Sequence, residues 1–376
     1  INRWFSDFTT EFEKAKFGEK YYFLPWILET LSNEILVQIK SQIGKNGILR
    51  ILRHDSIWAL AKIYNALDKL EQSEEGVFLR NNNVLDGMNR IGKRQFEWQR
   101  GIFSRQKLYR SYFIYYTPGA KDYFIKSHGI TIDEFIKGVF IVFGLLQNNH
   151  SMREDVDISS VAVEPINLPA VLKMISLSEI ELRKYASEIR YINLPTAYKP
   201  SVYRKFPLVM FEERGSKFYT CPLPPLILSR ICDGLFYDFG NDSKLRNEFS
   251  KRFEEYIFEL ISNNLGGKFE VLSEFIYSKV LRTPDILVRQ NADFNCAFEL
   301  KARRQSPYAR GATNASSEAA EAFMEIAKGI AQLWRFSQDV KVGRIDRVGR
   351  NEKYYLVLCT LDNWTEVSDN INKELR

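Results

Sequence analysis

Two acidic residues and a lysine accompany two short apolar segments in the last third of the chain. Asp285 precedes one segment, and Glu299 and Lys301 alternate with apolar residues in the other, residues 296–302. Because successive side chains of a strand point to opposite faces, Glu299 and Lys301 share one face. Turn residues at 291–293 suit a β-hairpin, which would set Asp285 beside Glu299. Two carboxylates this close repel each other unless a cation separates them, and Mg²⁺ is bound by one or two carboxylates together with waters and phosphate oxygens. The spacing therefore predicts a Mg²⁺ site with an amine at its edge.

Pro284-Asp285 followed by Glu299-Leu300-Lys301 resembles the PD-(D/E)xK signature of the restriction-endonuclease-like nuclease superfamily. The resemblance covers residues 241–376. It implies a Mg²⁺-dependent hydrolysis of phosphodiester bonds, with Mn²⁺ as a substitute ion and with DNA as the substrate more often than RNA. On this resemblance Asp285 and Glu299 hold the metal, and Lys301 orients or deprotonates the attacking water. The structural alternative is an edge hairpin with a surface Glu–Lys pair, since ion pairs can imitate sites.

Two further residues enter the candidate site through the same resemblance. In the superfamily, an acidic residue on the helix before the catalytic sheet often completes the metal site, and Glu254 fits that place better than the outward-pointing Glu255. Gln332 and Phe336 resemble the QxxxY element of one branch of the superfamily, with the tyrosine replaced by Phe336. Gln332 is therefore a candidate for contact with DNA or the site. An ordinary exposed helix glutamine is the alternative.

The apolar periodicity predicts helices and strands in residues 241–376. The resemblance implies that they form an α/β C-terminal domain of the restriction-endonuclease-like kind, with a central mixed sheet flanked by helices. Its expected elements are a helix at 241–264, a strand at 269–277, the hairpin, a helix at 316–338 and a buried strand at 354–361. This order is the minimal core of the resembled superfamily. A mainly helical region covers residues 1–240, with a subdomain break near 76–130, a capped helix at 131–147 and a hairpin at 206–221. We expect it to recognise the substrate or bind a protein partner.

Net charge does not identify a nucleic-acid partner, because the +6 of the whole chain is spread thinly. Residues 241–376 hold 21 basic and 20 acidic side chains, so only local clusters could attract a polyanion. The expected nucleic-acid-binding cations of this domain are Arg303, Arg304, Arg310, Arg344 and Arg347. Residues 90–110 form a second cluster of cations interleaved with aromatic rings. It could be a nucleic-acid groove or a solvated basic face on strands whose rings fill the core.

The remaining composition excludes several classes of protein. The four cysteines form no CxxC pair, which favours reduced thiols in a cytoplasmic protein over a disulfide framework or a zinc site. All three histidines lie before residue 151, which excludes an HExxH site and supports no Ser-His-Asp hydrolase. No apolar run reaches the roughly 20 residues that cross a bilayer, so no membrane partner is expected.

Three functions follow from these features. The first is a DNA-cleaving enzyme resembling prokaryotic restriction or anti-phage defence effectors. The second is a non-catalytic nucleic-acid-binding or scaffold subunit that keeps a restriction-endonuclease-like fold. The third is a helical assembly protein whose hairpin signature is accidental. Intact Asp285, Glu299 and Lys301 favour the first over the second, because a relic site has no reason to keep all three.

Overall fold

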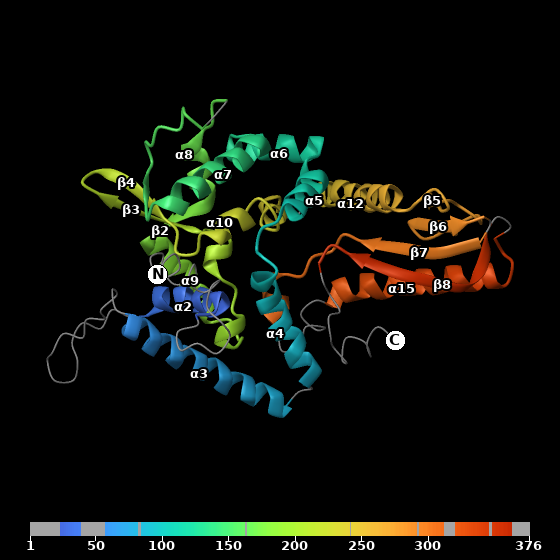
Figure 1. Cartoon of the computed structure of the whole chain (residues 1–376), viewed down its shortest axis with the longest axis horizontal. Coiled ribbons are helices and arrows are strands. Elements are labelled where there is room, and N and C mark those ends of the chain that lie inside the picture. The colour runs from blue at the N-terminus through green and yellow to red at the C-terminus, as the bar shows by residue number, and fades with distance from the viewer. Residues whose placement is uncertain are drawn as a thin grey trace. The chain divides into compact units, whose positions relative to one another are not determined.

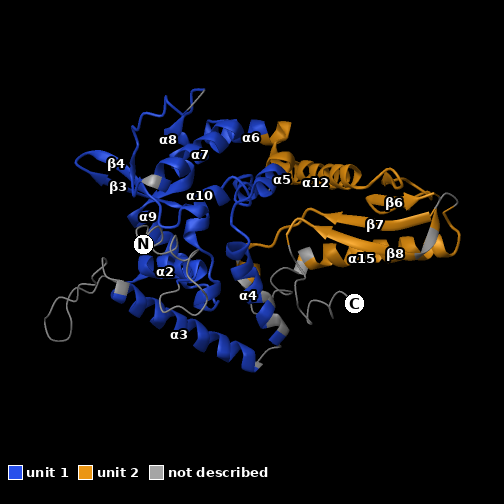
Figure 2. Cartoon of the chain, viewed as in Figure 1, with its two compact units in different colours: residues 1–111, 121–240 blue, residues 112–120, 241–376 orange. Residues whose placement is uncertain are grey.

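The computed structural model of the chain describes residues 23–38, 57–81, 84–161, 164–240, 242–291, 293–311, 320–345 and 348–362. The chain divides into two compact units (Figure 2), of residues 1–111 and 121–240 and of residues 112–120 and 241–376. One break in this division follows residue 240. The short segment 112–120 belongs to the second unit because Tyr115 packs edge-on against Phe249, with ring centroids 5.0 Å apart.

Helices make up most of the first unit (Figure 1). Their bounds are α2 Pro25–Val37, α3 Ile57–Asn81, α4 Val84–Gln99, α5 Arg105–Tyr115, α6 Pro118–His128, α7 Ile132–Asn148, α8 Leu168–Ile175, α9 Glu179–Arg190, α10 Pro225–Ser229 and α11 Leu235–Asp238, with short 3₁₀ turns at Thr196–Tyr198 and Val202–Arg204. Helices α5 and α6 extend into residues 112–120 of the second unit. The capping box predicted at Thr131 begins α7, with the Glu134 side chain bonded back to it. Ser178 caps α9 in the same way.

A four-stranded sheet accompanies these helices in the first unit. Its strands are β1 Met152–Arg153, β2 Ser176–Ser178, β3 Leu208–Glu213 and β4 Ser216–Thr220, in the order β1-β4-β3-β2. The predicted hairpin is present, and Arg214 and Gly215 form its turn with positive φ angles of 51° and 77°. Positive φ at both turn residues matches the twist of the flanking strands.

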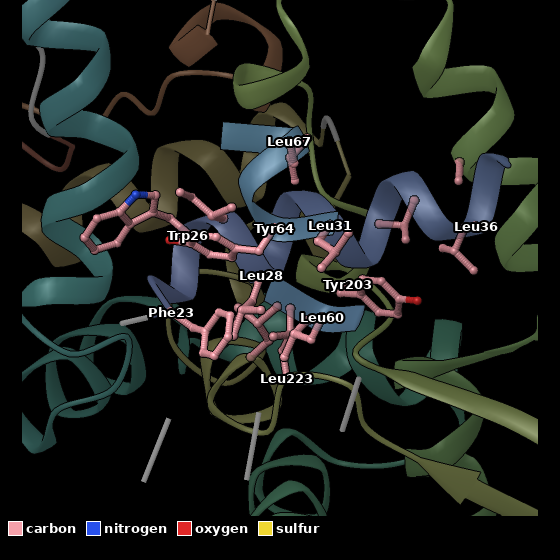
Figure 3. Close-up of a cluster of buried hydrophobic side chains, with 14 of the residues drawn as sticks. Phe23, Trp26, Leu28, Leu31, Leu36, Leu60, Tyr64, Leu67, Tyr203 and Leu223 are labelled. Carbon is pink, nitrogen blue, oxygen red and sulfur yellow. The ribbon is translucent and has the colours of Figure 1, made fainter. Parts of the chain in front are cut away.

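The core of the first unit is built on α2, whose Trp26, Leu28 and Leu31 lie among side chains from α3 and from Tyr203 (Figure 3). The basic-aromatic cluster of residues 90–110 lies on helices α4 and α5, so its predicted strands are wrong. Arg90 is buried between the rings of Phe78 and Tyr198, each centroid 4.0 Å from its guanidinium carbon. This arginine is enclosed between two rings inside the unit and does not line an open groove.

The second unit is a mixed four-stranded sheet with helices. Its elements are α12 Ser243–Asn264, β5 Glu270–Ser273, β6 Ile286–Gln290, β7 Asp293–Lys301, α13 Pro307–Gly311, α15 Ala320–Lys341 and β8 Gly349–Thr360. The sheet order is β5-β6-β7-β8, in which β5, β6 and β7 are antiparallel neighbours and β8 is parallel to β7. The amphipathic helix α15 packs along β7 and β8 and buries Leu333 and Phe336 against Leu287 and Ala297. Helix α12 contacts β5 and β7.

The chain is thus a mixed α/β protein with two small mixed sheets. Within the described ranges, none of the helices combines the length and apolar character that a bilayer crossing requires.

Candidate active site

The β6–β7 hairpin brings Asp285 next to Glu299, as predicted. Ile286 pairs with Phe298, so the position one residue before β6 lies opposite Glu299. Pro284 has no backbone N–H to extend the ladder. The Asp285 carboxylate accepts a hydrogen bond from the Leu300 N–H at 2.7 Å, and this bond holds the side chain against β7. Asp285 is therefore fixed in place by the strand that carries the other two candidate residues.

Glu299 and Lys301 form the second part of the site. They share a face of β7, and the Lys301 ammonium donates to Glu299 Oε1 at 2.9 Å. Glu299 is only 3% exposed, so the pair is held in a poorly solvated environment where its attraction is stronger than at a surface. Lys301 also donates to Gln332 Oε1 on α15 at 3.4 Å. The predicted residues Glu299, Lys301 and Gln332 are thus brought together.

A glycine that the sequence did not single out lets α15 approach this pair. A Cβ atom on Gly329 would lie 3.0 Å from Lys301 Cε, 3.2 Å from Glu299 Cγ and 2.8 Å from a methyl of Leu358. All three distances are shorter than ordinary contacts, so the site depends on the missing side chain. Glycine is the residue that permits such close approach between a helix and a strand.

Acidic residues in and near the Glu299–Lys301 pair have raised pKa values. Burial raises the pKa of Glu299 to about 7, and the carboxylates of Asp285 and Glu274 add to the shift while Lys301 opposes it. Burial is also the largest cause of the raised pKa of Asp285. Glu254 is exposed on α12, but partial desolvation of its carboxyl group raises its pKa to about 7, helped by repulsion from Asp285, Glu274 and Glu299. Glu254 thus lies within electrostatic reach of the site, as predicted.

Glu274 is the acid that sequence reasoning missed. It follows β5, its backbone N–H donates to the Asp285 carbonyl at 3.0 Å, and its carboxylate pairs with Arg282 at 2.6 Å. A strand was predicted at 269–277, which includes Glu274, but its pairing with β6 was not predicted. Once Ser273 is known to pair with Ile286, Glu274 falls beside Asp285.

The carboxylates do not form a ready three-ligand metal centre. Among the residues that the structure describes, no group of three or more His, Cys, Asp or Glu side chains is arranged to hold a metal ion. Asp285 is engaged by the Leu300 N–H, Glu299 by Lys301, and Glu254 contributes through charge at longer range. The metal ligand set of Asp285, Glu299 and Glu254 therefore stays a prediction. Two carboxylates still fit Mg²⁺, which takes its other ligands from waters and phosphate oxygens.

The expected nucleic-acid-binding arginines have different environments. Arg304 has 1% of its side chain exposed and lies 3.5 Å from Asp362, so it does not offer its charge to a ligand and that prediction is wrong. Arg310 pairs with the same Asp362 at 2.8 Å. Arg303 is exposed, and Arg344 is exposed but paired with Asp339 at 2.8 Å, while Arg347 lies outside the described residues. Asp362 thus anchors the segment after β7 to the end of β8.

The fold and site define a mixed α/β protein whose second unit carries paired carboxylates and a lysine on adjacent strands. No protein family, curated protein or solved structure matches this chain.

Proposed function

We propose that this protein is a Mg²⁺-dependent nuclease that hydrolyses phosphodiester bonds of DNA. The observation that carries the proposal is the meeting of Asp285, Glu299 and Lys301 on adjacent strands. The Leu300 N–H joins Asp285 to β7 at 2.7 Å, and Lys301 lies 2.9 Å from Glu299. Carboxylates whose pKa values are raised by burial and by one another are stabilised by a divalent cation between them.

The topology of the second unit supports the same proposal. The order α12, β5, β6, β7, α15, β8, with three antiparallel strands and β8 parallel to β7, is the order expected of a PD-(D/E)xK core. The candidate residues lie at the ends of β6 and β7, where that core would carry its site. Fold alone does not establish activity, so the proposal depends on the side chains.

Each side chain has a definite role in this proposal. Asp285 and Glu299 would hold Mg²⁺, which when bound supplies Lewis-acid polarisation of the scissile phosphate. Lys301 offsets charge that develops on the phosphate oxygens and orients the attacking water, and Gln332 limits the positions open to the Lys301 amine. Glu254 and Glu274 keep the region acidic, which favours cation binding.

The first unit has a different role in the proposal. We assign to it the recognition of the substrate or of a protein partner, as in prokaryotic restriction or anti-phage defence effectors. The four free cysteines favour a reducing compartment, and we place the activity in the cytoplasm.

Metal-dependent cleavage tests the proposal directly. The protein is incubated with linear, supercoiled and single-stranded DNA in Mg²⁺, in Mn²⁺ and in EDTA. Cleavage should require the metal and should fall in Asp285→Asn, Glu299→Gln and Lys301→Ala. Asp293→Asn, at the other end of β7, and Lys268→Ala, in the turn before β5, are matched controls that should cleave like the parent.

Two outcomes would overturn the proposal. An Asp285→Asn protein as active as the parent would remove the site assignment. DNA binding without cleavage under every metal condition would favour the non-catalytic subunit instead.

A further inference from the structure

A small hairpin projects from between two acids of the candidate site. Its arms lie between Glu274 and Asp285 and are held by hydrogen bonds from the Thr283 N–H to the Phe275 carbonyl at 3.0 Å and from the Tyr277 N–H to the Leu281 carbonyl at 3.1 Å. The Phe275 N–H donates to the Thr283 hydroxyl at 3.0 Å. Residues 275–283, which we call the site hairpin, are thus an ordered element and not a loose loop.

The site hairpin has two faces of opposite character. Phe275 and Tyr277 pack against the core of the second unit, and the Tyr277 hydroxyl donates to Asp339 on α15 at 2.7 Å. Ile276 and Val280 point outward and are 63% and 85% exposed. The anchored hairpin therefore presents two aliphatic side chains to solvent, where an apolar partner could contact them.

One exposed cation of the site hairpin suits a polyanion. Residues 275–283 contain Lys279 and Arg282, and the acids Glu274 and Asp285 flank the hairpin. Lys279 is exposed, whereas the Arg282 guanidinium is bound by Glu274 at 2.6 Å, which offsets its charge. Ile276 pairs with Arg282 across the two arms, and Lys279 and Val280 lie at the turn end. The hairpin therefore displays two aliphatic side chains and one exposed cation on one rigid element next to the candidate site.

We propose that the site hairpin inserts its exposed aliphatic side chains, Ile276 and Val280, into the minor groove of duplex DNA and opens the base stack, while Lys279 contacts a flanking phosphate. Aliphatic side chains do not bind phosphates, but proteins insert them between base steps of the minor groove. Cations beside the groove offset the cost of unstacking the bases. This inference rests on the proposed nuclease function and deepens it by making a locally opened duplex the substrate. Glu274 and Asp285 adjoin the hairpin, so the opened backbone would be delivered to Asp285 and Glu299.

Base unstacking can be measured separately from cleavage. Duplex DNA carrying the fluorescent base 2-aminopurine is titrated with the full-length Lys301→Ala protein in Mg²⁺, and affinity is followed by anisotropy. Binding should raise the 2-aminopurine emission. Val280→Ser and Ile276→Ser should abolish that rise and weaken duplex binding about tenfold, the loss expected when an apolar contact with bases is removed. Lys279→Ala should reduce the slope of log affinity against log salt by about 1.

Matched controls and outcomes keep the two proposals distinct. Leu260→Ser, at a 47% exposed aliphatic residue on α12 of the second unit, should leave emission and affinity unchanged. Metal-dependent cleavage by the parent together with hairpin variants that bind and unstack like it would overturn the hairpin proposal alone. Hairpin-dependent unstacking without cleavage would overturn the nuclease proposal alone. Equal losses on single-stranded and duplex DNA, or no DNA binding at all, would overturn the hairpin proposal.

Discussion

Gly329 of α15 lies directly against Lys301 of β7, so that a Cβ atom at position 329 would come within 3.0 Å of the lysine Cε. The same atom would meet Glu299 Cγ at 3.2 Å. One missing methyl group therefore sets the spacing between the helix and the ion pair. Helix α15 therefore positions the site in two ways: Gly329 has no side chain, which allows the close approach, and the Gln332 amide contacts Lys301.

Gly329→Ala should impair activity more than stability. The added methyl group must displace the Lys301 and Glu299 stems or the helix, and a shift of about 1 Å at a reacting group can cost about a hundredfold in rate. We expect kcat to fall by about ten- to a hundredfold. Gly144→Ala on α7 is the matched control, because nothing lies within 4 Å of a Cβ there. It should leave activity unchanged and stabilise the protein by up to about 1 kcal/mol. An unaffected Gly329→Ala enzyme would show that the close approach is unimportant.

The hairpin could be predicted from the sequence because strand periodicity and turn residues are local signals. They place Asp285 beside Glu299 without knowledge of the rest of the fold. Gly329 and Glu274 could not be predicted as site residues, since each enters through an element whose packing depends on the whole domain. Arg304 was misjudged for a related reason: its partner, Asp362, comes 58 positions later and is brought to it by the parallel pairing of β8 with β7.

The basic segment of residues 90–110 also could not be interpreted from local sequence alone. Local composition cannot distinguish an arginine that binds phosphate from one that is buried by aromatic rings. Arg90 is enclosed by Tyr198, a ring more than a hundred positions away, and Arg94 is bound by Glu71 at 2.7 Å. Both cations are used inside the protein, and only the folded arrangement reveals this.

Stability should depend on pH between about 4.5 and 7 because of the candidate site. Burial raises the pKa of Glu299 from 4.5 to about 7 in the folded protein. Below pH 4.5 the Glu299 carboxyl group is protonated in both the folded and the unfolded protein. Between the two values it ionises in the unfolded chain first, so stability falls as pH rises through this window. Added Mg²⁺ should restore stability near pH 7 and above, where the folded carboxylates are charged.

Thermal unfolding of the parent and of Glu299→Gln checks this dependence. Tm should fall from pH 4.5 to 7 in the parent and less in the variant, and Mg²⁺ should raise Tm only in the parent. A fall in Tm through this window that is as large in the variant as in the parent would exclude Glu299 as its source.

Nuclease activity should rise with pH through about 7. The pKa values of Glu299 and Glu254 are both raised to about 7, first by desolvation and then by neighbouring acids. Their ionised forms attract the cation, so the Mg²⁺ requirement should fall as pH rises. The measurement is the Mg²⁺ concentration for half-maximal cleavage at several pH values. Glu254→Gln should raise that concentration moderately and Glu299→Gln far more. A half-maximal concentration that does not vary with pH would contradict the assignment.

The first unit contains a buried ion network that should control its stability. Arg204 donates to Glu29 at 2.7 Å and to Glu97 at 2.6 Å, and Trp98 donates to Glu29 at 2.8 Å. Burial alone would raise the pKa of Glu29, but Arg204 and Trp98 hold it below 4.5. Arg204→Ala would leave a buried carboxylate without its cation and should destabilise the protein by about 3–5 kcal/mol.

Denaturant unfolding at pH 7 measures this loss, and Arg153→Ala is its control. Arg153 pairs with Asp155 at 2.7 Å, and both side chains are exposed, a kind of pair worth about 0.5 kcal/mol. The pKa of Glu29 is lower in the folded protein than its ordinary value of 4.5. The network therefore contributes to the free energy of unfolding above about pH 4.5, and this contribution is lost as pH falls through the pKa that Glu29 has in the folded protein. Acid unfolding should therefore narrow the gap between the parent and Arg204→Ala. Equal losses in the two arginine variants at pH 7 would show that burial adds nothing to the Glu29–Arg204 pair.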